Sequence, residues 1–126
     1  MKNRNQIDEV KALANLAGDR KLLTELAQIL SEDLPPLMRR LSFAMDQEDR
    51  ILTRLLIHKI KNLAAAFFAT EIGVLANQIE LDCAQGDYDL LKKDVRQLSK
   101  MLEYLLSEVY DRSWSDLKGV SLCQIK

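Results

Sequence analysis

His58 is the only histidine in the chain, and two lysines, Lys59 and Lys61, follow it within one helical turn. A histidine side chain in water titrates at about pH 6.5, so at neutral pH much of it is uncharged and offers a ring nitrogen as a nucleophile. Lys61 lies three residues on, and its ammonium group would suit an anionic group on the ring. This spacing indicates covalent carriage of an anionic group on His58.

Other common chemistries lack the residues they need. The two cysteines, Cys83 and Cys123, form no Cys-x-x-Cys or Cys/His cluster, so we expect no zinc site and reduced thiols. A Ser-His-Asp site would have to depend on the one histidine. The chain also has no glycine-rich phosphate loop, which leaves nucleotide binding without support.

The composition favours a single all-α domain. The 126 residues are 48% hydrophobic and only 6% aromatic, with few glycines and prolines. The 18 basic and 19 acidic residues nearly balance, so we expect no nucleic-acid partner. The sequence has neither a signal-peptide pattern nor an apolar run of roughly eighteen residues, so we expect a cytoplasmic protein without membrane contact.

Apolar residues recur at steps of three and four in five segments, which predicts five helices. The first is short and ends at Gly18-Asp19, and Thr70 is the expected cap of the fourth. The expected ranges are about 7–16, 19–44, 49–67, 70–83 and 87–110. Short turns between the last four predict an antiparallel up-and-down four-helix bundle with a short extra N-terminal helix.

Three features refine this prediction. Pro35-Pro36 falls inside the second helix, where a kink or a short break near Asp33 to Pro35 is expected. Gly86 is the expected C-cap of a tight hairpin before the last helix. We assign residues 1–110 to the bundle and 111–126 to a C-terminal tail, which is either mobile or packed on the bundle through Trp114, Leu117 and Leu122.

On a helical wheel, His58 points away from the apolar stripe of its own helix. That stripe contains Leu56, Ile60 and Phe67. Around the imidazole lie small, apolar and basic residues rather than the usual polar ones, a composition that partner-docking patches have. We predict a partner-binding surface formed by Ile51, Arg54, Leu55, Lys59, Asn62, Ala65 and Phe68. A solvent-exposed histidine without a task is the alternative.

The residues from His58 to Glu80 resemble the signature of the histidine-containing phosphotransfer (HPt) domain family. That signature is a histidine followed by x-Leu-Lys-Gly, small residues, and then Gly-Ala-x-x-Leu-x-x-x-Cys-x-x-Leu-Glu. Here HKIKNLAAAF (58–67) is followed by FATEIGVLANQIE (68–80), in register without a gap. The resemblance covers nearly the whole chain up to about Tyr110.

This resemblance implies roles for three residues. His58 would accept the phosphoryl group, Lys61 would neutralise its oxygens, and Glu80 would orient the imidazole from the neighbouring helix. It also implies that the chain itself needs no ATP, metal or other cofactor, since in this family the partner receiver domain supplies Mg²⁺.

Two positions depart from the family pattern. Asn62 replaces the glycine four residues after the histidine, where its side chain either obstructs the phosphoryl donor or donates a hydrogen bond to a phosphoryl oxygen. Phe68 replaces the second glycine, which suggests a different helix junction and an additional apolar contact.

We interpret the chain as a monomeric phosphorelay intermediate of two-component signalling that carries a phosphoryl group on His58 between receiver-domain aspartates. It would be a carrier rather than an enzyme, and its partners would be receiver domains of response regulators or hybrid sensor kinases. Two alternatives stay open: an HPt-fold module that sequesters a receiver or kinase without phosphotransfer, and a structural or oligomerising bundle with Phe67, Phe68 and Trp114 at its interface.

Overall fold

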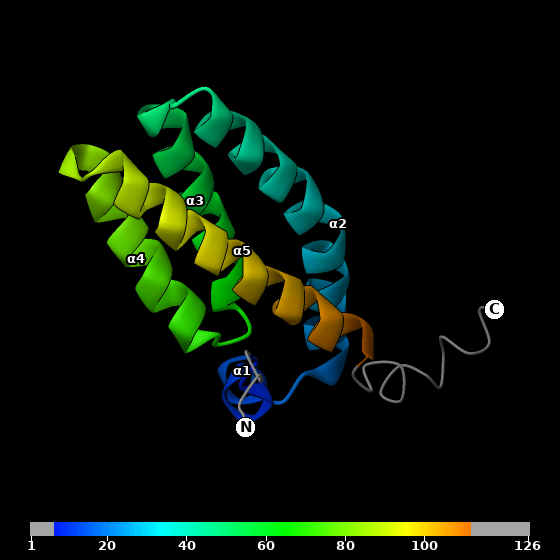
Figure 1. Cartoon of the computed structure of the whole chain (residues 1–126). Helices are drawn as coiled ribbons and strands as arrows, with labels where there is room; N and C mark the ends of the chain where they lie inside the picture. Colours follow the sequence, from blue (N-terminus) through cyan, green and yellow to red (C-terminus); the bar gives the residue numbers. More distant parts are fainter. Residues whose placement is uncertain (1–6, 112–126) are drawn as a thin grey trace.

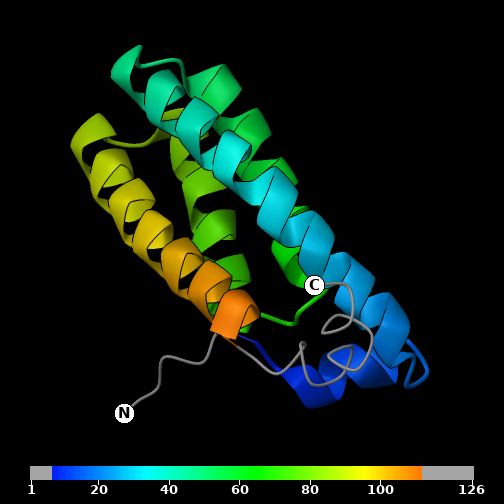
Figure 2. The same ribbon diagram turned by 90° about the vertical axis from the view of Figure 1, so that its right-hand side faces the viewer.

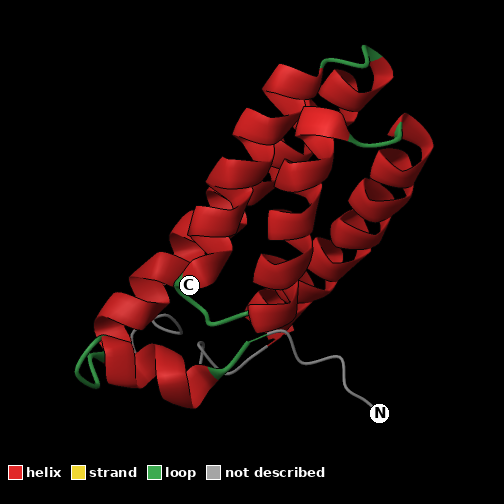
Figure 3. Cartoon of the chain, turned by 90° about the vertical axis from the view of Figure 1, so that its left-hand side faces the viewer, coloured by secondary structure: helices red, strands yellow, loops and turns green. Residues whose placement is uncertain are grey.

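The computed structural model describes residues 7–111, and this part of the chain contains helices and no strands (Figures 1 and 3). The helices are α1 (Glu9–Asn15), α2 (Arg20–Asp46), α3 (Arg50–Ala65), α4 (Thr70–Gln85) and α5 (Tyr88–Asp111). Each of the four long helices packs against the next, and α5 returns to α2 to close the bundle. The predicted four-helix bundle with an extra N-terminal helix is confirmed.

Part of the sequence prediction falls beyond this region. Trp114, Leu117, Leu122 and Cys123 lie outside the described residues. Among the helices within the described range, none is long and apolar enough to cross a membrane.

Aspartates begin three of the helices. Asp8, Asp19 and Asp49 each accept a hydrogen bond from the backbone N–H three residues ahead, at 3.0–3.1 Å. Helix α4 starts differently, because Ala69 is its N-cap and provides no side-chain bond. The prediction that Thr70 caps α4 is therefore wrong: Thr70 is already helical, and its hydroxyl donates back to the Phe68 carbonyl at 3.4 Å.

Helix α2 runs without interruption through Pro35 and Pro36, so of the two expected outcomes, a kink or a short break, the break is wrong. The two prolines have no N–H to offer the carbonyls of Ser31 and Glu32, four residues earlier. Ser31 is half-buried and Glu32 is exposed, so both lie on the outer side of the helix. Leu34, fully buried beside the prolines, keeps this part of the helix against the core.

Helix α1 covers one end of the bundle (Figure 2). The backbone N–H of Asp8 donates to the Phe67 carbonyl at 2.9 Å, and that of Ile7 donates to Glu108 Oε1 at 3.1 Å. These bonds join the N-terminal segment to the α3–α4 turn and to the end of α5. Phe67 is 1% exposed beneath this cover, so the alternative that placed it at an oligomer interface is wrong for this residue.

Arg50 joins the helices at the opposite end. Its guanidinium donates to the carbonyls of Asp82, Cys83 and Gly86 at 3.0–3.4 Å and lies 5.2 Å from the centre of the Tyr88 ring. The Tyr88 hydroxyl in turn donates to the Met45 carbonyl at 2.6 Å. All four long helices are thereby tied together where α4 ends and α5 begins.

Two aspartates meet between α4 and α5. Asp82 is only 8% exposed, and its Oδ2 atom has no hydrogen-bond partner among the described residues. Burial raises the pKa of Asp94. A hydrogen bond with Asp82 and the negative charge of Asp82 raise this pKa further, while the positive charge of Lys93 lowers it. A proton held by Asp94 would give the Oδ2 atom of Asp82 a donor, whereas Oδ1 already accepts a hydrogen bond from Gln78 Nε2 at 3.1 Å.

Gly86 is the C-cap of α4, as predicted, but the reason is space rather than a left-handed backbone. Its φ is −84°, and an added Cβ would lie 2.9 Å from the Asp82 carbonyl oxygen. Gly73, inside the same helix, has open space instead, since a Cβ added there would meet nothing within 4 Å.

Replacing each of these two glycines with alanine should have opposite effects on the stability of the protein. Gly86→Ala should lower the free energy of unfolding by about 1–3 kcal/mol, because the Asp82 backbone must move. Gly73→Ala should raise it by about 0.5–1 kcal/mol, because alanine favours a helix more than glycine does. Urea unfolding followed by circular dichroism measures both. Equal effects of the two substitutions would contradict the packing described here.

Candidate functional site

His58 lies on the outer side of α3, where its side chain is 59% exposed. The residues that set this orientation are Leu56, Ile57 and Ile60, which are buried against the other helices. Because successive helix residues are about 100° apart, burying these three turns His58 outward. The structure thus places the imidazole as the helical wheel predicts.

Glu80 on α4 faces the imidazole, and its Oε2 lies 3.1 Å from His58 Nδ1. An ionised carboxylate only accepts hydrogen bonds, so Nδ1 carries the hydrogen in this contact. In the neutral ring, the lone pair is then on Nε2. The geometry leaves Nε2 as the nucleophilic atom.

Lys61 contacts the same carboxylate oxygen. Its Nζ lies 3.2 Å from Glu80 Oε2 and donates to Asn77 Oδ1 at 2.9 Å. The structure therefore brings together all three residues to which the family resemblance gives roles, and it adds Asn77. The spacing offered a signal for this residue, since Asn77 precedes Glu80 by three positions and so lies on the same face of its helix.

The charge of Glu80 is maintained by its neighbours. Burial works to raise the pKa of this carboxyl group, but hydrogen bonds from His58 and Lys61 and the positive charge of these two residues outweigh it. The pKa of Glu80 therefore lies below its ordinary value. At neutral pH the group is ionised and can hold the hydrogen on Nδ1.

Apolar side chains extend along α3 from the imidazole. Ile51 is 81% exposed and Leu55 is 54% exposed, although both are large hydrophobic residues. Together with Arg54, His58, Lys59 and Glu80 they line an open depression of about 630 Å³. We call Ile51, Arg54, Leu55, His58 and Lys59 the His58 face; it combines an apolar centre with basic groups.

The other predicted partner-binding residues differ in how exposed they are. Asn62 and Ala65 are exposed on the next turns of α3, and Asn62 makes no side-chain hydrogen bond in the described structure. Phe68 is half-buried and packs against the core, which is the additional apolar contact that we expected. Its φ of +53° lies in the left-handed region that favours glycine, the residue of the family pattern at this position.

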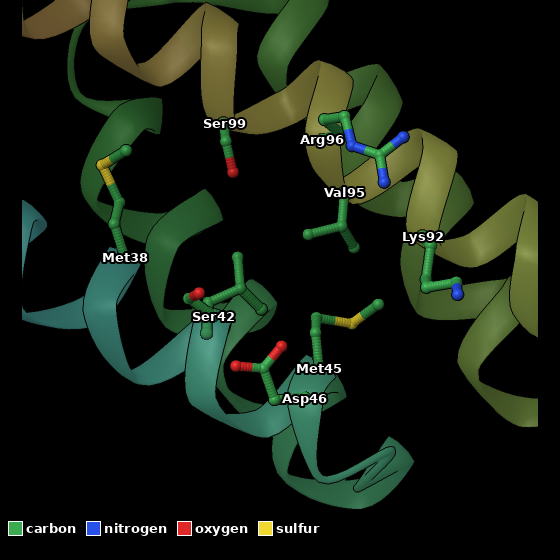
Figure 4. A pocket seen from close by; sticks show the side chains of 9 residues that line it. Met38, Ser42, Met45, Asp46, Lys92, Val95, Arg96 and Ser99 are labelled. Atoms are coloured by element: carbon green, nitrogen blue, oxygen red, sulfur yellow. The ribbon is translucent and has the colours of Figure 1, made fainter.

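A second depression, of about 270 Å³, lies between α2 and α5 (Figure 4). Met38 and Met45 of α2 and Val95 of α5 line its apolar part, and Lys92 and Arg96 stand on the α5 side. No residue predicted as part of the site lines it. The described residues also contain no group of three or more histidine, cysteine or acidic side chains that could hold a metal ion.

Comparison with known proteins gives one match. Residues 25–108, two thirds of the chain, match the family described as Hpt domain, and they include every residue of the His58 face as well as Lys61, Asn77 and Glu80. No curated protein and no solved structure matches the chain.

Removing the positive charge beside Glu80 should change its titration. Lys61→Met is expected to raise the pKa of Glu80 toward its ordinary value, because the substitution removes both a hydrogen bond and an opposite charge. A ¹³C NMR titration of the Glu80 side-chain carboxyl measures this. Lys59→Met is the matched control, since Lys59 forms no ion pair with Glu80, and an equal shift in the control would contradict the described contact.

Proposed function

Because the chain belongs to the Hpt domain family, we propose that it is a phosphorelay intermediate, which carries a phosphoryl group on His58 between aspartates of receiver domains. Membership makes it a histidine phosphotransfer module of two-component signalling, a carrier that interacts with receiver domains. One observation supports His58 as the acceptor: Glu80 contacts Nδ1 and leaves Nε2 free on an exposed helix face.

The proposed transfer is an in-line displacement at phosphorus. The Nε2 lone pair attacks the aspartyl phosphate of a receiver, the bond between phosphorus and the aspartate oxygen breaks, and the aspartate leaves as a carboxylate. Since Nδ1 keeps its hydrogen, the phosphorylated ring carries a positive charge, which the Glu80 carboxylate stabilises. The reverse step delivers the phosphoryl group to the aspartate of a second receiver.

Lys61 has the charge that this transfer requires. Phosphoryl transfer depends largely on alignment and on neutralising charge spread over three oxygens. A lysine ammonium has three N–H donors, of which Glu80 and Asn77 occupy two. The third is available to a phosphoryl oxygen on the neighbouring ring.

The His58 face is the proposed docking surface for receiver domains. Exposed Ile51 and Leu55 offer apolar area, and Arg54 and Lys59 would meet acidic groups around a receiver's phosphorylated aspartate. Opposite charges of this kind mainly accelerate association, so binding should be transient and sensitive to salt. We propose that the receiver contributes Mg²⁺ and that this chain binds no cofactor.

A binding module without phosphotransfer is the second candidate, and the position of Asn62 favours it. This residue is exposed one turn beyond His58, where the family pattern has glycine. An amide at this place can keep a receiver's aspartyl phosphate from approaching Nε2 while the apolar part of the surface still binds.

Phosphotransfer from a receiver distinguishes the two candidates. We expect the protein, mixed with a ³²P-phosphorylated receiver domain and Mg²⁺, to gain acid-labile, base-stable phosphate. His58→Gln should abolish this label, because an amide nitrogen is no nucleophile, while the exposed position preserves the fold. Binding without any label in the wild-type protein would instead support sequestration, and the absence of binding to several receivers would support a structural role.

The docking proposal predicts a separate effect for Leu55. Leu55→Asp should weaken binding to a receiver domain at least tenfold, because a charge would enter the apolar centre of the interface. Val10→Asp is the matched control, since Val10 is 79% exposed on α1 and lies outside the His58 face. Fluorescence anisotropy measures both affinities, and an equal loss for the two variants would argue against this surface.

A further inference from the structure

Asn77 lies on α4 one turn before Glu80 and shares Lys61 with it. Lys61 Nζ donates to Asn77 Oδ1 at 2.9 Å and lies 3.2 Å from Glu80 Oε2. The second contact ends on the oxygen that also faces His58 Nδ1. A continuous series of polar contacts therefore joins Asn77 to the imidazole through Lys61 and Glu80.

A lysine needs such a second anchor to hold one position. Its four-carbon stem is flexible, and a single ion pair fixes the charge poorly. Here the Lys61 side chain is only 23% exposed, and both acceptors come from α4, so the ammonium is held across the seam between α3 and α4.

The amide of Asn77 suits this task because it is neutral. Its carbonyl oxygen accepts a hydrogen bond from the ammonium without cancelling the positive charge. That charge remains effective toward Glu80 and toward an anionic group on His58. A carboxylate at the same position would add a second negative charge beside Lys61, which already pairs with Glu80.

We propose that Asn77 is a positioning residue for phosphotransfer, which holds Lys61 beside Glu80 and His58. This inference rests on the proposed function of His58. Asn77 makes no hydrogen bond to His58 itself and acts only through the lysine.

A double-mutant cycle tests this dependence. Asn77→Ala should slow transfer from a phosphorylated receiver domain to His58 about three- to tenfold, because Lys61 loses one hydrogen bond to a partly exposed charge. In a Lys61→Met background the same substitution should change the rate less than twofold, since no lysine remains to be positioned. Gln85→Ala, an exposed position near the end of the same helix, is the control and should leave the rate unchanged.

A second measurement needs no receiver domain. In the free protein, Asn77→Ala should raise the pKa of Glu80 toward its ordinary value, as followed by ¹³C NMR of the carboxyl group, and should have no such effect in the Lys61→Met background. A structural defect that merely loosened α4 would not depend on Lys61 in this way.

The outcomes separate the inference from the function on which it rests. Equal slowing in both backgrounds would mean that Asn77 acts independently of Lys61, and the inference would be overturned. Unchanged transfer rates together with an unchanged Glu80 titration would overturn it as well. If the wild-type protein accepts no phosphoryl group from any receiver while the titration still shifts only in the presence of Lys61, the proposed function fails and the positioning contact stands.

Discussion

The burial of one side of α3 constrains the rest of the molecule. Ile57 and Ile60 are fully excluded from water, and each contributes roughly 1.5–3 kcal/mol relative to an exposed position. Any rotation of α3 that buried His58 would expose them. The position of the nucleophile is therefore set by apolar packing in which the imidazole takes no part.

The same packing assembles the polar contacts. Helices α3 and α4 pack directly against each other, and Ala64 of α3 and Ala76 of α4 are almost completely buried in the core. Glu80 can then reach across the seam to His58, and Lys61 can reach back to α4. A single carboxylate oxygen receives both groups, so the orientation of the ring and the position of the cation depend on each other.

Much of the fold could be predicted because its determinants are local. Apolar periodicity and the capping aspartates Asp19 and Asp49 act within one or two turns, and the structure agrees with the predicted helices to within a few residues. The break at Pro35-Pro36 was wrong because the packing of Leu34 and its neighbours outweighs the two lost hydrogen bonds. The cap at Thr70 was wrong because Ala69 takes the N-cap position after the left-handed residue Phe68, and Thr70 is already the first residue of the helix.

For the site, the sequence by itself determined that His58 faces outward with Lys61 one turn away, since both follow from the geometry of one helix. Glu80 was predicted as a site residue from a family resemblance, and its distance from the imidazole is set only by how α3 packs on α4. Asn77 was missed for the same reason, because its partner lies 16 positions earlier on another helix. Contacts between helices depend on their relative rotation and separation, which the complete core determines and no local pattern encodes.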